Sequence, residues 1–278
     1  MSRIITITSD WGNTDFYAAA FKGAILNIDP SLTIVDITHR VNKFDINNAA
    51  YQIKNCYYFF PKGSIHIIDV NQTPITNKDN AKHYIAFKYD GHYFLCKNNG
   101  LMYLICDNSA NIEKIIRIKN LKNENHHTFR ALDAFVHQAS MLAKTDDLSS
   151  IGDDYPIENL TTFNVSESNI RYNPSTNTLA FKVKHIDSYG NIITDLKRAD
   201  FEKYANGRMF NFSSNCNHES AMCKITNTYT AADPFFVFNT NDYLEIGSNG
   251  SDFAAVLSLS NRDFTQWNLY ITFLPTEQ

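Results

Sequence analysis

The chain has 278 residues, of which 44% are hydrophobic, 13% aromatic and 19% charged, and 25 basic against 29 acidic residues give a formal net charge of −4. This is an ordinary globular composition, which excludes disordered, collagenous and small disulfide-stapled proteins. Because the chain is mildly acidic and its lysines are scattered, we expect no nucleic-acid partner.

The amino terminus and the cysteines bear on the cellular compartment. Residues 4–8 form too short an apolar run for a signal peptide, and no stretch approaches the roughly 18 apolar residues of a membrane helix. The cysteines number five, and none form a Cys-x-x-Cys pair. We therefore expect a cytoplasmic protein without a membrane partner.

The first half of the chain alternates β-branched strands with amphipathic helices. Strands are predicted at residues 4–8, 33–37 and 64–69, and helices at residues 15–28, 45–53 and 131–143. We expect Asp45 and Thr128 to cap the second and third helices, and a hairpin to turn at Asp90-Gly91. The strand–helix alternation is typical of a parallel sheet with helical crossovers.

The second half predicts a different architecture. Residues 153–178 are rich in Asn, Ser, Thr and Pro without periodicity, as in a linker. Short apolar runs then predict strands at residues 179–185, 209–212, 235–238, 243–246, 253–257 and 267–273. We predict an α/β fold with an amino-terminal mixed or parallel sheet flanked by helices (residues 1–160), a linker (161–177) and a smaller carboxyl-terminal antiparallel β domain (178–278).

Common catalytic motifs are absent from the sequence, including the dinucleotide-binding, P-loop, zinc-protease and nucleophile-elbow patterns. The neighbouring His126 and His127 suggest a metal pair, but adjacent side chains rarely point at one ion, and no cysteine or carboxylate stands at ligand spacing. A solvated loop is favoured here, and no metal is expected.

Two turns carry groups suited to a nucleoside. Asp10 follows the first predicted strand, where open α/β sheets bind their ligands. Its carboxylate can accept from two ribose hydroxyls, or it can cap the following helix. The second turn, Asp-Ser-Tyr-Gly-Asn at residues 187–191, holds Tyr189, which can stack on a base or fill a hairpin.

Together with the segments between them, these turns resemble the family of S-adenosyl-L-methionine hydroxide adenosyltransferases and their relatives, the fluorinases and chlorinases. The order and spacing of several motifs carry the resemblance. They are Thr-Ser-Asp-Trp-Gly at residues 8–12, Val-Asp-Ile-Thr-His at 35–39, Phe-Pro-Lys-Gly-Ser-Ile-His at 60–66, Asn-Asn-Gly-Leu at 98–101, Thr-Phe at 128–129 and Asp-Ser-Tyr-Gly-Asn-Ile-Ile-Thr at 187–194.

The resemblance implies a homotrimer that binds a small-molecule nucleoside where one subunit's first domain meets its neighbour's second. It implies a ribose contact from Asp10, an aromatic cover from Phe44 and aromatic flanks for the adenine from Tyr189 and Tyr229. The full set of implied substrate contacts is Asp10, Trp11, Phe44, Asp187, Tyr189, Asn191, Tyr229 and Asn249. The resemblance also implies S-adenosylmethionine as the substrate or ligand, and no cofactor is expected.

The positions at which the family activates water are altered. Asn71, Lys78 and Arg130 stand where an Asp, an Arg and a His are usual. An amide cannot take a proton as a carboxylate can, and a guanidinium is never the base. Asp69, which lies on the same side of a strand as Asn71, or His127 can take over this role.

Several functions stay open from the sequence. The leading hypothesis is hydrolysis of S-adenosylmethionine to adenosine and methionine by displacement at the ribose C5′. The alternatives are a binding module without turnover and a pocket for another nucleoside. Lys78 and Arg130 can favour an anionic nucleophile, although like charge repels the sulfonium. Halogenation is disfavoured because residues 76–98 lack the loop insertion that marks fluorinases and chlorinases.

Overall fold

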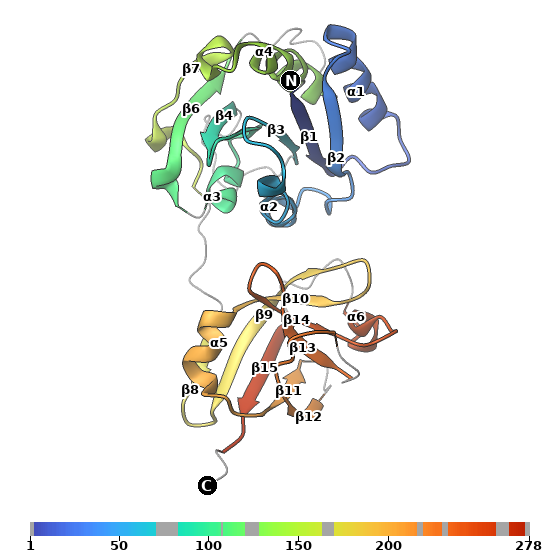
Figure 1. Ribbon diagram of the computed structural model, residues 1–278, viewed down its shortest axis with the longest axis vertical. Coiled ribbons are helices and arrows are strands. Elements are labelled where there is room, and N and C mark those ends of the chain that lie inside the picture. Colours follow the sequence, from blue (N-terminus) through green and yellow to red (C-terminus); the bar gives the residue numbers. More distant parts are fainter. Residues whose placement is uncertain are drawn as a thin grey trace. The chain divides into compact units, whose positions relative to one another are not determined.

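The computed structural model describes residues 3–70, 83–106, 108–119, 128–162, 170–215, 219–229, 233–259 and 267–275. The chain divides into two compact units, Met1–Val165 and Ser166–Gln278. The first is a mixed sheet with helices and the second is mainly antiparallel strands (Figure 1), which confirms the predicted fold class. Within the described ranges, no helix has the length and apolar character needed to span a membrane.

The first unit is built on a seven-stranded sheet with the order β2-β1-β3-β5-β4-β6-β7. Its strands are β1 (Ile4–Ser9), β2 (Thr33–Thr38), β3 (Ile65–Asp69), β4 (Tyr84–Tyr89), β5 (His92–Lys97), β6 (Ile112–Ile118) and β7 (Gly152–Asp154). Parallel pairs join β1 to β2 and β3, and β3 to β5, whereas the β4, β6 and β7 pairs are antiparallel. The predicted hairpin is confirmed, since Asp90 and Gly91 both have positive φ angles, as a type I′ turn requires.

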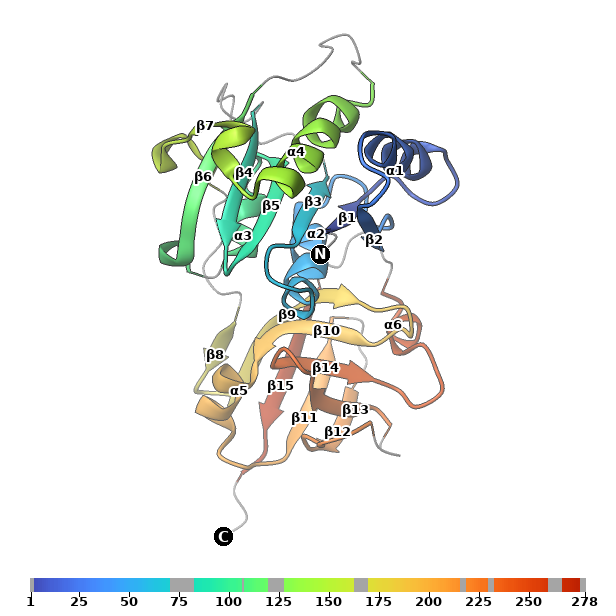
Figure 2. The ribbon, with the colours of Figure 1, turned by 45° about the horizontal axis from the view of Figure 1, so that its top comes forward.

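Helices cover both faces of this sheet. They are α1 (Tyr17–Ile28), α2 (Ile46–Lys54), α3 (Leu101–Ile105) and α4 (His137–Thr145), with short 3-10 turns at Tyr57–Phe59, Ser109–Asn111, Leu148–Ser150 and Ile157–Asn159. α1 and α4 lie side by side over one face (Figures 1 and 2), and α2 and α3 pack on the other. Asp45 caps α2 as predicted, because its Oδ1 accepts the backbone amides of Asn47 and Asn48 at 3.0 Å.

The predicted helix at residues 131–143 begins differently from expectation. A π-helical segment, η4 (Leu132–Val136), precedes α4. Ala131 stands at its N-cap and no side chain caps it, so the predicted Thr128 cap is wrong. Because π-helical turns recur at functional sites, this segment directs attention to the neighbouring Arg130.

The second unit is an eight-stranded antiparallel sheet around a core rich in phenylalanine. Its elements are β8 (Arg171–Asn173), β9 (Thr178–Ile186), β10 (Ile192–Lys197), α5 (Arg198–Ala205), β11 (Phe210–Ser214), β12 (Glu219–Cys223), β13 (Phe235–Phe238), β14 (Tyr243–Gly247), α6 (Phe253–Val256) and β15 (Asn268–Phe273). The strand expected at residues 253–257 is the helix α6, because the Asp252 side chain caps it by accepting the Ala255 amide at 2.8 Å. β8 lies within the stretch expected to be a linker.

Two buried histidines join three strands of the first sheet. His66 Nδ1 hydrogen bonds to Thr6 Oγ1 at 2.7 Å, and His66 Nε2 lies 3.2 Å from His92 Nδ1. Both histidines are fully buried. Burial lowers the pKa of His66 from 6.5 to about 3 and that of His92 to about 4, so both rings are neutral at physiological pH.

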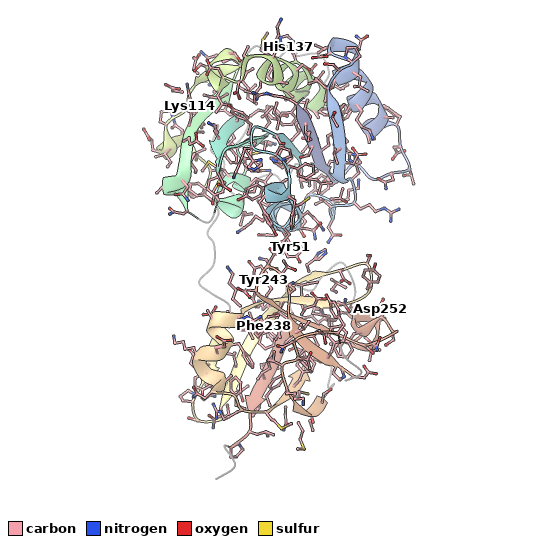
Figure 3. All side chains as sticks on the ribbon, viewed as in Figure 1. Tyr51, Lys114, His137, Phe238, Tyr243 and Asp252 are labelled. Carbon is pink, nitrogen blue, oxygen red and sulfur yellow. The ribbon has the colours of Figure 1, made fainter. Side chains whose placement is uncertain are left out.

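These rings should make the protein sensitive to acid. Below pH 6.5 His66 binds a proton in the unfolded state but stays neutral in the folded state. The free energy of unfolding therefore decreases as the pH is lowered from about 6.5 to about 3. Replacing His66 by glutamine should reduce the loss of unfolding free energy between about pH 7 and about pH 5 by about 2 kcal/mol. Thermal unfolding at the two pH values measures this difference. The control is His137→Gln, on the outer side of α4 (Figure 3), which leaves the buried pair and the wild-type pH dependence intact.

Candidate functional site

A cleft of about 650 Å³ opens in the first unit at the carboxyl ends of β1 and β3. The chain leaves β1 toward β2 on one side and leaves β3 toward β4 and β5 on the other, and open α/β sheets bind ligands at such a reversal. Carboxylates, cations and aromatic rings meet there. The lining residues are Asp10, Trp11, Asp15, Tyr17, Lys43, Phe44, Asp69, Tyr84, Lys97, Thr128, Phe129, Arg130 and Ala131.

Asp10 is buried at the base of this cleft, immediately after β1. Its Oδ2 accepts the Phe44 backbone amide at 2.8 Å, and its carbonyl accepts from the Lys43 ammonium. No described residue donates to Oδ1, which leaves one oxygen for a ligand hydroxyl. The alternative that Asp10 caps the following helix is wrong, because α1 begins at Tyr17 after Phe16 and has no side-chain cap.

Phe44 has a backbone conformation that large residues seldom adopt. Its φ angle is +64°, and its side chain is 59% exposed. Strained backbone of this kind persists where the surroundings hold it, and here the Phe44 amide is held by the Asp10 carboxylate. The ring is therefore an open apolar surface at the cleft.

Trp11 connects the ends of β1 and β3. Its Nε1 donates to Asp69 Oδ2 at 2.8 Å, and its ring stacks on His39 with centroids 5.5 Å apart. His39 is held in turn, because its Nδ1 lies 2.7 Å from Ser9 Oγ and its Nε2 lies 3.2 Å from Asp36 Oδ1. The indole is consequently fixed on both sides.

Asp69 ends β3 and is partly buried. Burial raises the pKa of its carboxyl to about 6; the Trp11 hydrogen bond opposes this rise, the Asp10 charge adds to it and the Lys97 charge opposes it. Desolvation and a nearby like charge both disfavour the ionised form of a carboxyl group. Asp69 therefore changes protonation state near neutral pH.

Cations stand beside these carboxylates. Arg130 lines the cleft just before η4, and its carbonyl accepts the Ala134 amide at 2.9 Å. Burial lowers the pKa of Lys97, the last residue of β5, although Asp69 raises it. Of the three positions at which the resemblance implies a change, only Arg130 is described; Asn71 and Lys78 lie outside the described residues.

Four residues that line this cleft were not predicted from the sequence, namely Lys43, Tyr84, Lys97 and Phe129. The sequence predicts the hairpin of β4 and β5, but it does not predict that this hairpin lies beside β3. β5 pairs in parallel with β3, so its last residue reaches the same edge, and antiparallel β4 begins there with Tyr84. Placing the hairpin beside β3 would have indicated Tyr84 and Lys97.

A second pocket, of about 520 Å³, lies in the second unit. It collects all the site residues predicted for the carboxyl-terminal half, namely Asp187, Tyr189, Asn191, Tyr229 and Asn249. Asn249 is exposed in a turn. The residues on either side of this turn are joined by a hydrogen bond, in which Ser251 Oγ donates to Ser248 Oγ at 2.7 Å.

The Asp187 carboxylate organises the turn that carries Tyr189. Its Oδ1 accepts the amides of Tyr189 and Asn191, each at 2.9 Å, and its Oδ2 accepts the Asn191 side chain at 3.1 Å. Gly190 is required there, because φ is +82° and a Cβ would lie 2.2 Å from Asp252 Oδ1, beside the start of α6 (Figure 3). Tyr189 is 80% exposed, so the alternative that it fills a hairpin is wrong.

Tyr229 presents the second open ring of this pocket. The residue is 64% exposed, and its hydroxyl donates to Glu245 at 3.1 Å while its ring meets Phe235 edge-on. Burial and the Glu245 charge raise the pKa of Tyr229 to about 12, so it remains a neutral donor. The pocket thus offers two tyrosine surfaces, and the carboxylates that line it, Asp187 and Asp252, both accept backbone amides.

Metal binding has no support from the described ranges, where no group of three His, Cys, Asp or Glu side chains is placed to hold an ion. His126 and His127 lie outside the described residues.

Comparisons with known proteins agree with this architecture. The models for the SAM hydroxide adenosyltransferase N-terminal and C-terminal domains match residues 5–152 and 181–266. An (R)-S-adenosyl-L-methionine hydrolase of Methanocaldococcus jannaschii is 26% identical over 269 residues, covering 94% of each chain. A fluorinase of an Actinoplanes species is 26% identical over 227 residues, covering 72% of this chain and 74% of the relative.

The fold itself is shared with a solved structure of an uncharacterized conserved protein from Thermotoga maritima. The TM-score is 0.80 at 21% identity, and the match covers 97% of this chain and 99% of the other. The family models extend over most of both units and bear out the resemblance carried by the motifs. The chain therefore belongs to the S-adenosyl-L-methionine hydroxide adenosyltransferase family.

Proposed function

We propose that this protein binds S-adenosyl-L-methionine and hydrolyses it to adenosine and L-methionine by displacement at the ribose C5′. The observation that carries the proposal is the pair of carboxylates, Asp10 and Asp69, at the ends of adjacent parallel strands and beside Trp11. One carboxylate suits the ribose hydroxyls, and the pair suits a sulfonium cation. Family membership supports the same substrate.

We propose that the complete site draws on both units in a cytoplasmic homotrimer, with the first unit of one copy facing the second unit of a neighbour. Asp10 and Phe44 then hold and cover the ribose, while Tyr189 and Tyr229 flank the adenine. Asp187 and Asn191 border the methionine and adenine side, and Asn249 contacts the base. The support is chemical, since the carboxylate suited to the ribose, Asp10, belongs to one unit and the two open tyrosine rings belong to the other.

The chemistry needs a dry and well-ordered site. The sulfonium leaves as neutral methionine, so positive charge disappears from the substrate as the C5′–S bond breaks. Expelling water lowers the barrier of a reaction that annihilates charge, and alignment of water, C5′ and sulfur supplies much of the rest. A group in the cleft must also take the proton of the attacking water, whose pKa in bulk is about 15.7.

A second candidate function is binding of S-adenosylmethionine or adenosine without turnover. The observation that favours it is the replacement of the family's Asp, Arg and His by Asn71, Lys78 and Arg130. None of these three side chains is a suitable base in its ordinary protonation state.

Product analysis separates the two functions. Purified protein incubated with S-adenosylmethionine should release adenosine and methionine in equal amounts, followed by chromatography. Added fluoride or chloride should not produce a halogenated nucleoside. Measurable binding with no adenosine above background would favour the binding module instead.

Asp10→Ala should abolish nucleoside binding, because the ribose loses its charged acceptor. A hydrogen bond to a charged group contributes about 1.5–3 kcal/mol, so affinity for adenosine should fall at least about tenfold. Isothermal titration calorimetry measures this loss. The control is Glu158→Ala, an exposed carboxylate far along the same unit, which should bind like wild type; unchanged affinity in Asp10→Ala would refute the ribose assignment.

Restoring two family side chains tests whether the altered positions limit the rate. Asn71→Asp combined with Arg130→His should raise the hydrolysis rate, because a carboxylate and an imidazole can both accept protons. The initial rate of adenosine release measures the effect. A rate equal to or below that of wild type would mean that the chain activates water by other groups.

A further inference from the structure

Three carboxylates line the cleft, namely Asp10, Asp15 and Asp69. Asp10 already accepts the Phe44 amide and is the group suited to the ribose. Asp15 is exposed at the rim, where solvent keeps it well hydrated. Asp69 alone among these three combines a partly buried position with a location at the end of a central strand.

The strand pattern directs Asp69 to the side of the sheet on which the cleft lies. Side chains two residues apart on a strand share a face. Ile65 and Ile67 pack in the core beneath α1 and α4, so Asp69 continues the same row beyond the helices. In the β1–β3 ladder Ser9 is the partner of Asp69, and Asp10 therefore follows directly beside it.

Asp69 is held by one oxygen only. Trp11 Nε1 donates to Oδ2 at 2.8 Å, and no described residue hydrogen bonds to Oδ1. Asp69 is also one of the residues that line the cleft. A carboxylate fixed in this way can accept a hydrogen bond from a water molecule in the cleft without changing its rotamer.

The groups facing Asp69 favour a carboxylate that gains and loses a proton near neutral pH. Asp10 raises its pKa, whereas Lys97 and the Trp11 indole lower it. Tyr84, at the start of β4, feels the charges of both Asp69 and Arg130. A base serves best when its pKa lies near the working pH.

We infer that Asp69 is the catalytic base that takes a proton from the attacking water, in a chain whose family carboxylate is replaced by Asn71. The inference rests on the proposed hydrolysis. As the proton moves to Asp69, the water oxygen bonds to C5′, the C5′–S bond breaks, and its electron pair stays on the sulfur of methionine. The proton then passes from Asp69 to solvent, so that one substrate cation and one water yield adenosine, methionine and one proton.

The direct test is Asp69→Asn, which keeps the shape and the Trp11 contact but removes the base. Turnover of S-adenosylmethionine should fall by about 10²- to 10⁴-fold, the usual contribution of a positioned base. Adenosine binding and the unfolding temperature should stay close to wild type, since Asp10 still holds the ribose. The control is Asp154→Asn, an exposed carboxylate on β7, which should turn over like wild type.

A pH profile distinguishes a base from a structural role. At saturating substrate the wild-type rate should fall as the pH drops through about 6, where Asp69 becomes protonated. Trp11→Phe removes the hydrogen bond that lowers the pKa of Asp69, so this fall should move to a higher pH. A structural role would change the rate without moving the profile.

The outcomes separate the two claims. Full turnover in Asp69→Asn, or a wild-type profile that is flat around pH 6, overturns the assignment of Asp69 while leaving the proposed hydrolysis intact. Binding without any wild-type turnover overturns the proposed hydrolysis and the assignment together. Loss of turnover with retained adenosine binding, and a shifted profile in Trp11→Phe, supports both.

Discussion

The parallel pairing of β1 with β3 is the constraint on which the candidate site depends. It sets Ser9 opposite Asp69 and so brings two carboxylates, Asp10 and Asp69, to one edge of the sheet. A slip of one residue would turn the side chains of β3 to the other face, away from the cleft. The Trp11–Asp69 hydrogen bond closes this arrangement across 58 positions of sequence.

Charged side chains of both signs lie at this edge of the sheet. In the proposed function Asp10 and Asp69 attract the substrate sulfonium, while the Lys97 charge opposes the rise that burial and Asp10 cause in the pKa of Asp69. Such a balance suits a substrate that enters as a cation and leaves as neutral products. It also tunes Asp69 through burial and charge, which is how proteins adjust carboxyl groups for proton transfer near neutral pH.

The two pockets differ in chemistry because they differ in architecture. Parallel strands end together and collect polar side chains at one edge, as Asp10 and Asp69 do. The antiparallel unit instead exposes aromatic rings on turns, and the Asp187 carboxylate fixes the turn that carries the exposed Tyr189. The three positions at which the resemblance implies a change, Asn71, Lys78 and Arg130, all belong to the sequence of the first unit.

Local patterns in the sequence determined β1 to β5, α1, α2, most of the helix at residues 131–143, the Asp45 cap, the Asp90-Gly91 turn and the Asp10 and Tyr189 turns, because each is set by neighbouring residues. The elements β6, β7 and α3 were not predicted. The Thr128 cap and the strand at residues 253–257 were wrong, since a π-helical turn and the Asp252 cap are not visible in periodicity. Only the tertiary structure decided that β5 lies beside β3, that Lys97 and Tyr84 reach the cleft and that Trp11 binds Asp69. Strand order and burial depend on contacts between residues distant in sequence. The charge state of Asp69 depends on both, so it could not be predicted from local patterns.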